Sequence, residues 1–157
     1  MKSRLLTVFG LLGLSACSNE SFFTVGRDEV ACESSIPTAC GSTARCVLDA
    51  SHYLKGDFPS GRRFIVRTTG ESDLKFEIYL DERHAPGTSL RLEVSEPSCN
   101  EKSTYDSAGA DIFDRAGADG ILVIPMHTVR PGDHLVELSS DAYCSYVLLF
   151  SMQTASP

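Results

Sequence analysis

The aspartates between positions 111 and 119 have the spacing that most nearly matches a metal site. Asp111, Asp114 and Asp119 are three and five residues apart, and Gly120 follows the last of them. Calcium prefers oxygen ligands, and carboxylates on a glycine-containing loop can wrap around the ion. The spacing departs from the EF-hand pattern, however, and turn-capping aspartates in a solvated loop have the same composition. The segment is therefore consistent with a calcium site or with a solvated loop, and no other cofactor is expected.

The residue types that carry out catalysis form no recognised motif. The chain has no G-x-S-x-G nucleophile elbow, and no glycine-rich phosphate loop follows a strand and opens a helix. A cysteine nucleophile needs a histidine base beside it. The histidines are instead scattered along the chain, at His52, His84, His127 and His134. The chain also lacks tryptophan, which would stack on sugars, and we therefore expect a protein that is not an enzyme.

Cysteines provide the expected covalent framework. Apart from Cys17, which belongs to the N-terminal segment, the candidates for disulfides are Cys32, Cys40, Cys46, Cys99 and Cys144. We expect Cys99 to pair with Cys144, and Cys46 to pair with Cys32 or Cys40. The leftover thiol is a buried free cysteine, an intermolecular disulfide or a redox site. The spacing C-x7-C-x5-C lacks the paired C-x2-C of a zinc site.

The N-terminal segment has the composition of an export signal. Lys2 and Arg4 precede an apolar run over residues 5–14, which is too short to cross a bilayer. The run ends in Leu14-Ser15-Ala16-Cys17, an aliphatic residue and two small residues before a cysteine. This order resembles the lipobox of bacterial lipoproteins. The resemblance implies cleavage before Cys17, a diacylglycerol on its thiol and an acyl chain such as palmitate on its new amino group.

The charge of the processed chain bears on its partners. Removing residues 1–16 from the 157 leaves 141, and losing Lys2 and Arg4 takes the formal net charge from −7 to −9. An acidic chain is repelled by nucleic acid and by anionic headgroups, so we expect no nucleic-acid partner and a membrane attachment made by the lipid. Ser18 stands where aspartate would favour the inner membrane. The lipobox resemblance therefore implies a lipid anchor in the outer membrane, facing the periplasm or the cell surface.

Side chains alternate with period two beyond residue 62. Apolar and polar residues alternate over 74–80 and 90–94, as in half-buried antiparallel strands. Turn formers at 55–61 and 131–133 predict turns, and residues 120–125, apolar on both faces, predict a central strand. We predict an all-β, antiparallel, jelly-roll-like β-sandwich with no more helix than one turn within 108–115. The expected core is Phe64, Val66, Phe76, Ile78, Leu80, Leu90, Leu92, Val94, Ile121, Val123, Val136, Leu138, Tyr146, Leu148 and Phe150.

Three segments near the C-terminus resemble one family. Gly120-Ile-Leu-Val-Ile, Pro131-Gly-Asp-His-Leu-Val-Glu-Leu and Tyr146-Val-Leu-Leu-Phe occur in the order found in prepeptidase C-terminal-type domains. The resemblance covers about residues 62–152. It implies a small jelly-roll sandwich with a role in binding or presentation and not in catalysis. Cys144 departs from the family pattern.

The sequence thus predicts a signal peptide over 1–16, a lipidated tether over 17–31, a cysteine-bounded extension over 32–61 and a β-sandwich over 62–157. An anchored sandwich without a catalytic motif suggests an interaction or accessory subunit of a cell-envelope complex, of the secretion or motility type. The alternatives are a surface lipoprotein that binds calcium or an extracellular polymer, and an enzyme that uses the odd thiol for redox chemistry.

Overall fold

The computed structural model describes residues 38–44, 46–49, 52–81, 88–116 and 119–154. This part of the chain is built almost entirely of strands. They are β1 (Thr38–Ala39), β2 (Ser42–Thr43), β3 (Val47–Leu48), β4 (Tyr53–Thr68), β5 (Ser72–Leu80), β6 (Leu90–Ser95), β7 (Lys102–Asp106), β8 (Ile121–Thr128) and β9 (Gly132–Thr154). Between β7 and β8 lies the short helix α1 (Ile112–Arg115), the helical turn predicted within 108–115. The described residues include no helix long and apolar enough to span a membrane.

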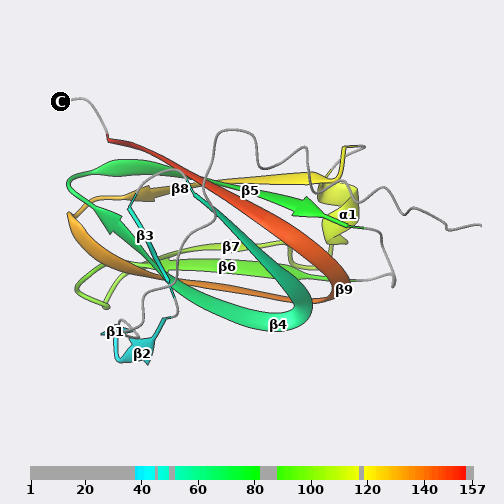
Figure 1. Cartoon of the computed structure of the whole chain (residues 1–157), viewed down its shortest axis with the longest axis horizontal. Helices are drawn as coiled ribbons and strands as arrows, with labels where there is room; N and C mark the ends of the chain where they lie inside the picture. Colours follow the sequence, from blue (N-terminus) through cyan, green and yellow to red (C-terminus); the bar gives the residue numbers. More distant parts are fainter. Residues whose placement is uncertain (1–37, 45, 50–51, 82–87, 117–118, 155–157) are drawn as a thin grey trace, which may run out of the picture.

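Two long strands organise the sheet. β4 and β9 pair antiparallel from Tyr53 opposite Leu149 to Thr68 opposite Gly132. Their register shifts between Phe58 and Ser60, where a β-bulge lets both strands bend, as Figure 1 shows. The predicted turn at 55–61 is therefore wrong, because Pro59 lies at the bulge and needs no hydrogen bond in the ladder.

The bend divides one hydrogen-bonded sheet into two layers. In the first layer β9 pairs with β6 through residues 136–140, and β6 pairs with β7. In the second layer β9 pairs with β5 through residues 146–154, and β5 pairs with β8. Every long pairing is antiparallel, while the short β3 runs parallel to β4. The predicted all-β sandwich is confirmed, with a mixed sheet.

The core lies between the two layers. Most of the predicted core residues are buried, including Phe64, Phe76 and Phe150. The prediction for β8 is wrong, because Val123 is 50% exposed and the buried side chains are those of Leu122, Ile124 and Met126. β8 is an edge strand rather than a central one. Pro125 fits this position, since an edge strand tolerates a residue without an N–H group. Ile121 and Leu80 are only partly buried.

The first layer is also covered on part of its outer face. Ile65 and Leu135 lie opposite each other there and pack with Ala44 in a small second cluster. Burial on both faces explains why Phe64, Ile65 and Val66 form an unbroken apolar run. The signal segment, the tether over 17–31, Cys17 and Cys32 lie outside the described residues, and the expectations for them stay predictions.

Candidate functional site

The three aspartates proposed as calcium ligands do not form a cluster in the structure. Asp111 is the N-cap of α1, where its Oδ1 accepts hydrogen bonds from the Phe113 amide at 3.0 Å and the Thr88 hydroxyl at 3.1 Å. Asp114 and Asp119 are exposed. Over the described ranges, no three His, Cys, Asp or Glu side chains are placed to hold a metal ion. The geometry thus gives Asp111 a capping role, and calcium binding stays a prediction.

The disulfide pairing differs from the one expected. Cys40 bonds to Cys99 with their Cα atoms 5.3 Å apart, so the predicted Cys99–Cys144 and Cys40–Cys46 pairs are wrong. Cys99 lies in the loop between β6 and β7, whereas Cys144 lies opposite Phe58 and belongs to the core. Cys46 is disulfide-bonded as well. Its other predicted partner, Cys32, lies outside the described residues.

Cys144 carries the free thiol among the described cysteines. Burial, together with the nearby carboxylates of Asp81 and Asp57, raises the pKa of this thiol to about 11. The thiolate is the reactive form of cysteine, and such a pKa leaves very little of it at neutral pH. The arrangement suits a small apolar core residue better than a redox centre.

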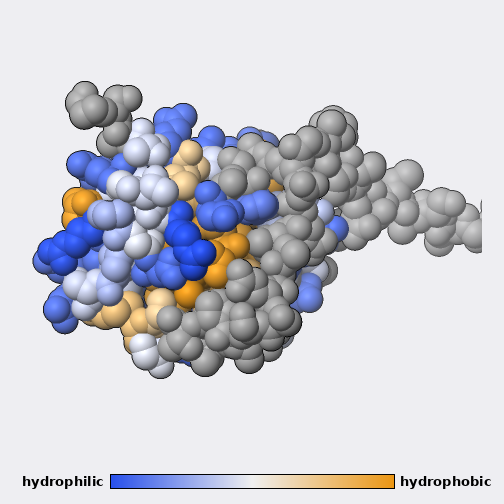
Figure 2. All heavy atoms as spheres, turned by 60° about the vertical axis from the view of Figure 1, so that its left-hand side comes forward, coloured by the Kyte–Doolittle hydropathy of each residue, from blue (hydrophilic) through white to orange (hydrophobic). Residues whose placement is uncertain are grey.

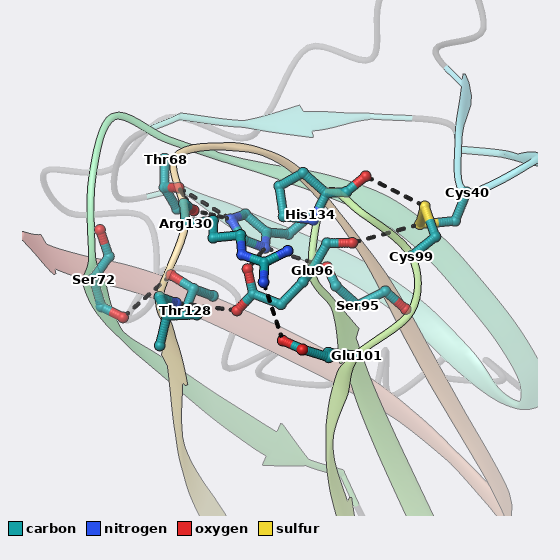
Figure 3. Close-up of polar contacts among 12 residues, drawn as sticks. Cys40, Thr68, Ser72, Ser95, Glu96, Cys99, Glu101, Thr128, Arg130 and His134 are labelled. Atoms are coloured by element: carbon teal, nitrogen blue, oxygen red, sulfur yellow. Dashed lines mark hydrogen bonds and ion pairs between the residues drawn. A yellow bond between two sulfur atoms is a disulfide. The ribbon is translucent and has the colours of Figure 1, made fainter.

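A buried polar cluster lies at one end of the sandwich (Figure 3). At its centre the fully buried His134 places Nδ1 3.2 Å from the Ser95 carbonyl oxygen and Nε2 3.0 Å from that of Arg130. The Thr68 hydroxyl lies 3.0 Å from Nε2. One imidazole thereby connects the ends of β4 and β6 to the loop that follows β8. Figure 2 shows mainly hydrophilic side chains on the surface of this end.

Glu96 joins that cluster to the disulfide. Its Oε1 accepts from the Val129 amide at 3.0 Å, and its Oε2 lies 3.8 Å from Nδ1 of His134. Its backbone carbonyl accepts from the Cys99 amide at 2.7 Å and lies 3.8 Å from Sγ of Cys40. A buried carboxylate is costly unless it is paired, so this cluster holds the β6–β7 loop in one conformation.

A groove of about 1130 Å³ crosses the outer face of the first layer. We call it the cationic groove. It passes over β7, β6, β9 and β4 and continues to the bend. Its lining consists of Ala44, Gly56, Ser60, Gly61, Arg62, Arg63, Arg91, Glu93, Lys102, Glu137, Leu138, Ser139 and Tyr146.

Strand register brings the charged side chains of the groove together. Arg63 lies opposite Glu137, and Glu137 lies opposite Glu93, so these three form one row across three strands. Arg63 donates from Nε to Glu137 at 2.6 Å. Glu93 accepts from Lys102 at 2.9 Å and also from Arg91. The hydrogen bond from Lys102 is the main cause that lowers the pKa of Glu93, against the desolvation that raises it.

The groove ends at Tyr146, close to the bend. The Tyr146 ring stacks on Phe58 with a centroid distance of 4.3 Å. Burial raises the pKa of its hydroxyl, while the charge and hydrogen bond of Arg62 act in the opposite direction. Gly56 makes this position possible, because a Cβ there would lie 2.5 Å from the tyrosine hydroxyl oxygen.

Sequence reasoning missed this groove. Its cations come from positions 62, 63, 91 and 102, and no local motif links them. The pair Arg62-Arg63 and the strand alternation of Arg91 and Glu93 were the signals present in the sequence. Neither shows which strands are neighbours, and neighbours decide which charges meet.

Comparison with known proteins gives structural neighbours. No protein-family model and no curated protein matches the chain. It is similar to the pre-peptidase C-terminal domain of collagenase from Bacillus anthracis, at 8% identity and a TM-score of 0.46, covering 68% of this chain and 92% of that one. It is also similar to the 4-O-methyl-alpha-glucuronidase BtGH115A of family GH115, at 11% identity and a TM-score of 0.40, covering 67% of this chain and 14% of that one.

A third neighbour is the carbohydrate-binding module CBM6cm-2 from Cellvibrio mixtus lichenase 5A, at 11% identity and a TM-score of 0.33, covering 73% of this chain and 77% of that one. The pre-peptidase domain and this module are β-sandwiches, the class to which the described residues belong. Similarities at this level concern the fold and identify no site, so the function must be argued from the chain's own residues.

Proposed function

We propose that this chain is a non-catalytic outer-membrane lipoprotein that serves as an interaction or accessory subunit of a cell-envelope complex, of the secretion or motility type. The observation that carries the proposal is the lipobox-like Leu14-Ser15-Ala16-Cys17 ahead of a β-sandwich. Two or more acyl chains anchor a protein stably to a bilayer, whereas one is marginal.

The arrangement of polar groups supports a binding role rather than catalysis. His134 and Glu96 are buried and hold loops together, and the Cys144 thiol is buried with a raised pKa. His127 is exposed and contacts Asp73 at 2.9 Å and Glu71 at 3.1 Å through its two ring nitrogens. The two histidines contact neighbouring polar groups and the thiol is buried, which favours a rigid module that presents its surface.

Crosslinking mass spectrometry on a tagged full-length copy in intact cells tests the proposal. We expect reproducible crosslinks to one envelope complex, and their loss in a Cys17→Ala variant that cannot receive the lipid. A well-recovered bait in the outer-membrane fraction with no protein crosslinks would reject the role as a subunit. Recovery of the wild-type protein in the soluble fraction would reject the anchor.

A second candidate function is that of a ligand-binding lipoprotein, and the cationic groove is the observation that favours it. Calcium at Asp111, Asp114 and Asp119 is one form of this candidate. Calorimetric titration of the full chain with calcium tests that form directly. Binding that is lost in Asp114→Asn and Asp119→Asn would support it, and the absence of heat together with an unchanged melting temperature would end it.

A further inference from the structure

We propose that the cationic groove binds a linear anionic polysaccharide, with carboxylate groups of the sugars held by Arg63 and Arg91. The inference rests on the second candidate function, that of a ligand-binding lipoprotein, and names its site and ligand class. It does not depend on an envelope partner.

The charge of the groove is opposite to that of the chain. Four cationic side chains line it against two carboxylates, whereas the whole chain carries a formal net charge of −7. A local surplus of cations on an acidic protein attracts an anion to that place. This pattern fits a specific anionic ligand.

The arginines keep donors free for such a ligand. Arg63 contacts Glu137 through Nε, and Arg91 contacts Glu93 through Nη2. A guanidinium has five N–H donors in a fixed fork, so each arginine retains donors that match a carboxylate. The two side chains are 55% and 53% exposed and therefore accessible. Glu137 and Glu93 hold them in position.

The shape of the groove favours a chain-like ligand. A second hollow of about 570 Å³ continues it, and the two share Ser60, Gly61, Arg91 and Ser139. The second hollow also carries the carboxylates of Asp106 and Asp141, so the surplus of cations belongs to the cationic groove alone. Gly61 and Ser139 lie opposite each other across β4 and β9, so small side chains form the floor between charged walls. An extended polymer can lie along an open trough, whereas a compact metabolite is usually enclosed in a pocket.

The lining suits sugars better than a polypeptide. Protein interfaces depend on aromatic and aliphatic anchors, but the apolar lining residues Ala44, Leu138 and Tyr146 are buried. The groove instead offers serine hydroxyls and two carboxylates, which can accept hydrogen bonds from sugar hydroxyls. With no exposed aromatic ring in the lining, neutral sugars lack a stacking surface, so charge must supply most of the affinity.

Isothermal titration calorimetry of the full chain in detergent, with oligogalacturonate as the probe, tests the inference. We expect binding that weakens as salt rises, because exposed charges are screened. The double variant Arg63→Gln, Arg91→Gln should bind at least about tenfold more weakly, a loss of about 1.4 kcal/mol. The matched control is Arg130→Gln, which removes a similarly exposed arginine outside the groove and should leave the affinity unchanged.

Further measurements decide the outcome. If the double variant keeps the melting temperature of the wild type, its loss of binding is not a loss of fold. Arg91→Lys keeps the positive charge but removes the planar fork, so weaker binding by this variant would support the fork contact. No binding of oligogalacturonate, or equal binding by its methyl-esterified form, would overturn the proposal. Equal affinity for poly-glutamate would overturn it in favour of an acidic polypeptide.

Discussion

Two carboxylates three residues apart in the sequence are both largely buried, but their partners lie in opposite environments. Glu93 lies on the outer face of β6, between the exposed cations Lys102 and Arg91. Glu96 lies just beyond the end of β6, buried beside His134 and tied through its backbone to the disulfide loop. The cations around Glu93 are about half exposed, whereas His134 beside Glu96 is fully buried. The difference teaches that similar polar contacts of a carboxylate have different consequences, because water reaches the partners of Glu93 and not the partner of Glu96.

The largest expected effect comes from the Cys40–Cys99 disulfide beside the buried polar cluster. Replacing both cysteines, Cys40→Ser and Cys99→Ser, opens a closure that spans 59 residues. The loop-entropy relation gives a loss of about 4 kcal/mol in the free energy of unfolding. Denaturant unfolding of the variant and the wild type measures it. Changing the residues avoids reduction of the disulfide at Cys46. A loss below about 1 kcal/mol would mean that the polar cluster alone holds the loop.

The next largest effect is expected at His134, the centre of the buried polar cluster. His134→Ala empties a fully buried position and removes the ring contacts to the Ser95 and Arg130 carbonyl oxygens. It also leaves Oε2 of Glu96 without its nearest charged neighbour, while Oε1 keeps the Val129 amide. We expect a loss of about 3 kcal/mol, measured by denaturant unfolding. The matched control is His127→Ala, at an exposed histidine that also contacts carboxylates, and its loss should be much smaller. If both variants lost the same free energy of unfolding, burial would not be what makes His134 important.

A smaller effect is expected at the end of the groove. Gly56→Ala places a methyl group where the Tyr146 hydroxyl lies, at 2.5 Å, so the ring must shift away from Phe58. Overpacking of this kind costs about 1–3 kcal/mol. Thermal unfolding measures the change. Gly61→Ala is the matched control, because its nearest neighbour would be a backbone oxygen at 3.9 Å. A destabilisation at Gly61 as large as that at Gly56 would contradict the steric explanation.

The smallest effect is expected from the pair that Lys102 forms with Glu93. Lys102→Gln removes a partner of Glu93 from the surface, and an exposed pair contributes no more than about 1 kcal/mol. The pKa of Glu93 is lowered in the folded chain, so its contribution is present above the unfolded pKa and is lost as the pH falls through the folded value. The free energy of unfolding at neutral pH should therefore exceed that at acidic pH by less in the variant than in the wild type. An unchanged difference would place the acid sensitivity elsewhere, for example at Asp133, whose pKa is lowered mainly by Arg67.

Local alternation was sufficient to predict the strands that are buried on one face. In β5 and β6, Phe76, Ile78 and Leu92 alternate with polar residues, and side chains on a strand point to opposite faces in turn. Where both faces are apolar, as at residues 121–124, the pattern does not show which side chains face the core. The choice of Ile121 and Val123 was wrong. The first part of the bent strand β4 also escaped prediction, because Gly56, Pro59 and Gly61 are turn formers that here build a bulge.

By itself the sequence determined the class of fold and the acidic character of the chain, because composition and side-chain period do not depend on which strands become neighbours. Only the tertiary structure decided the Cys40–Cys99 pairing, the meeting of His134 with Glu96 and the assembly of the cationic groove. These contacts join residues far apart in the chain. Their geometry follows from register across a bent sheet, a property that no single segment encodes.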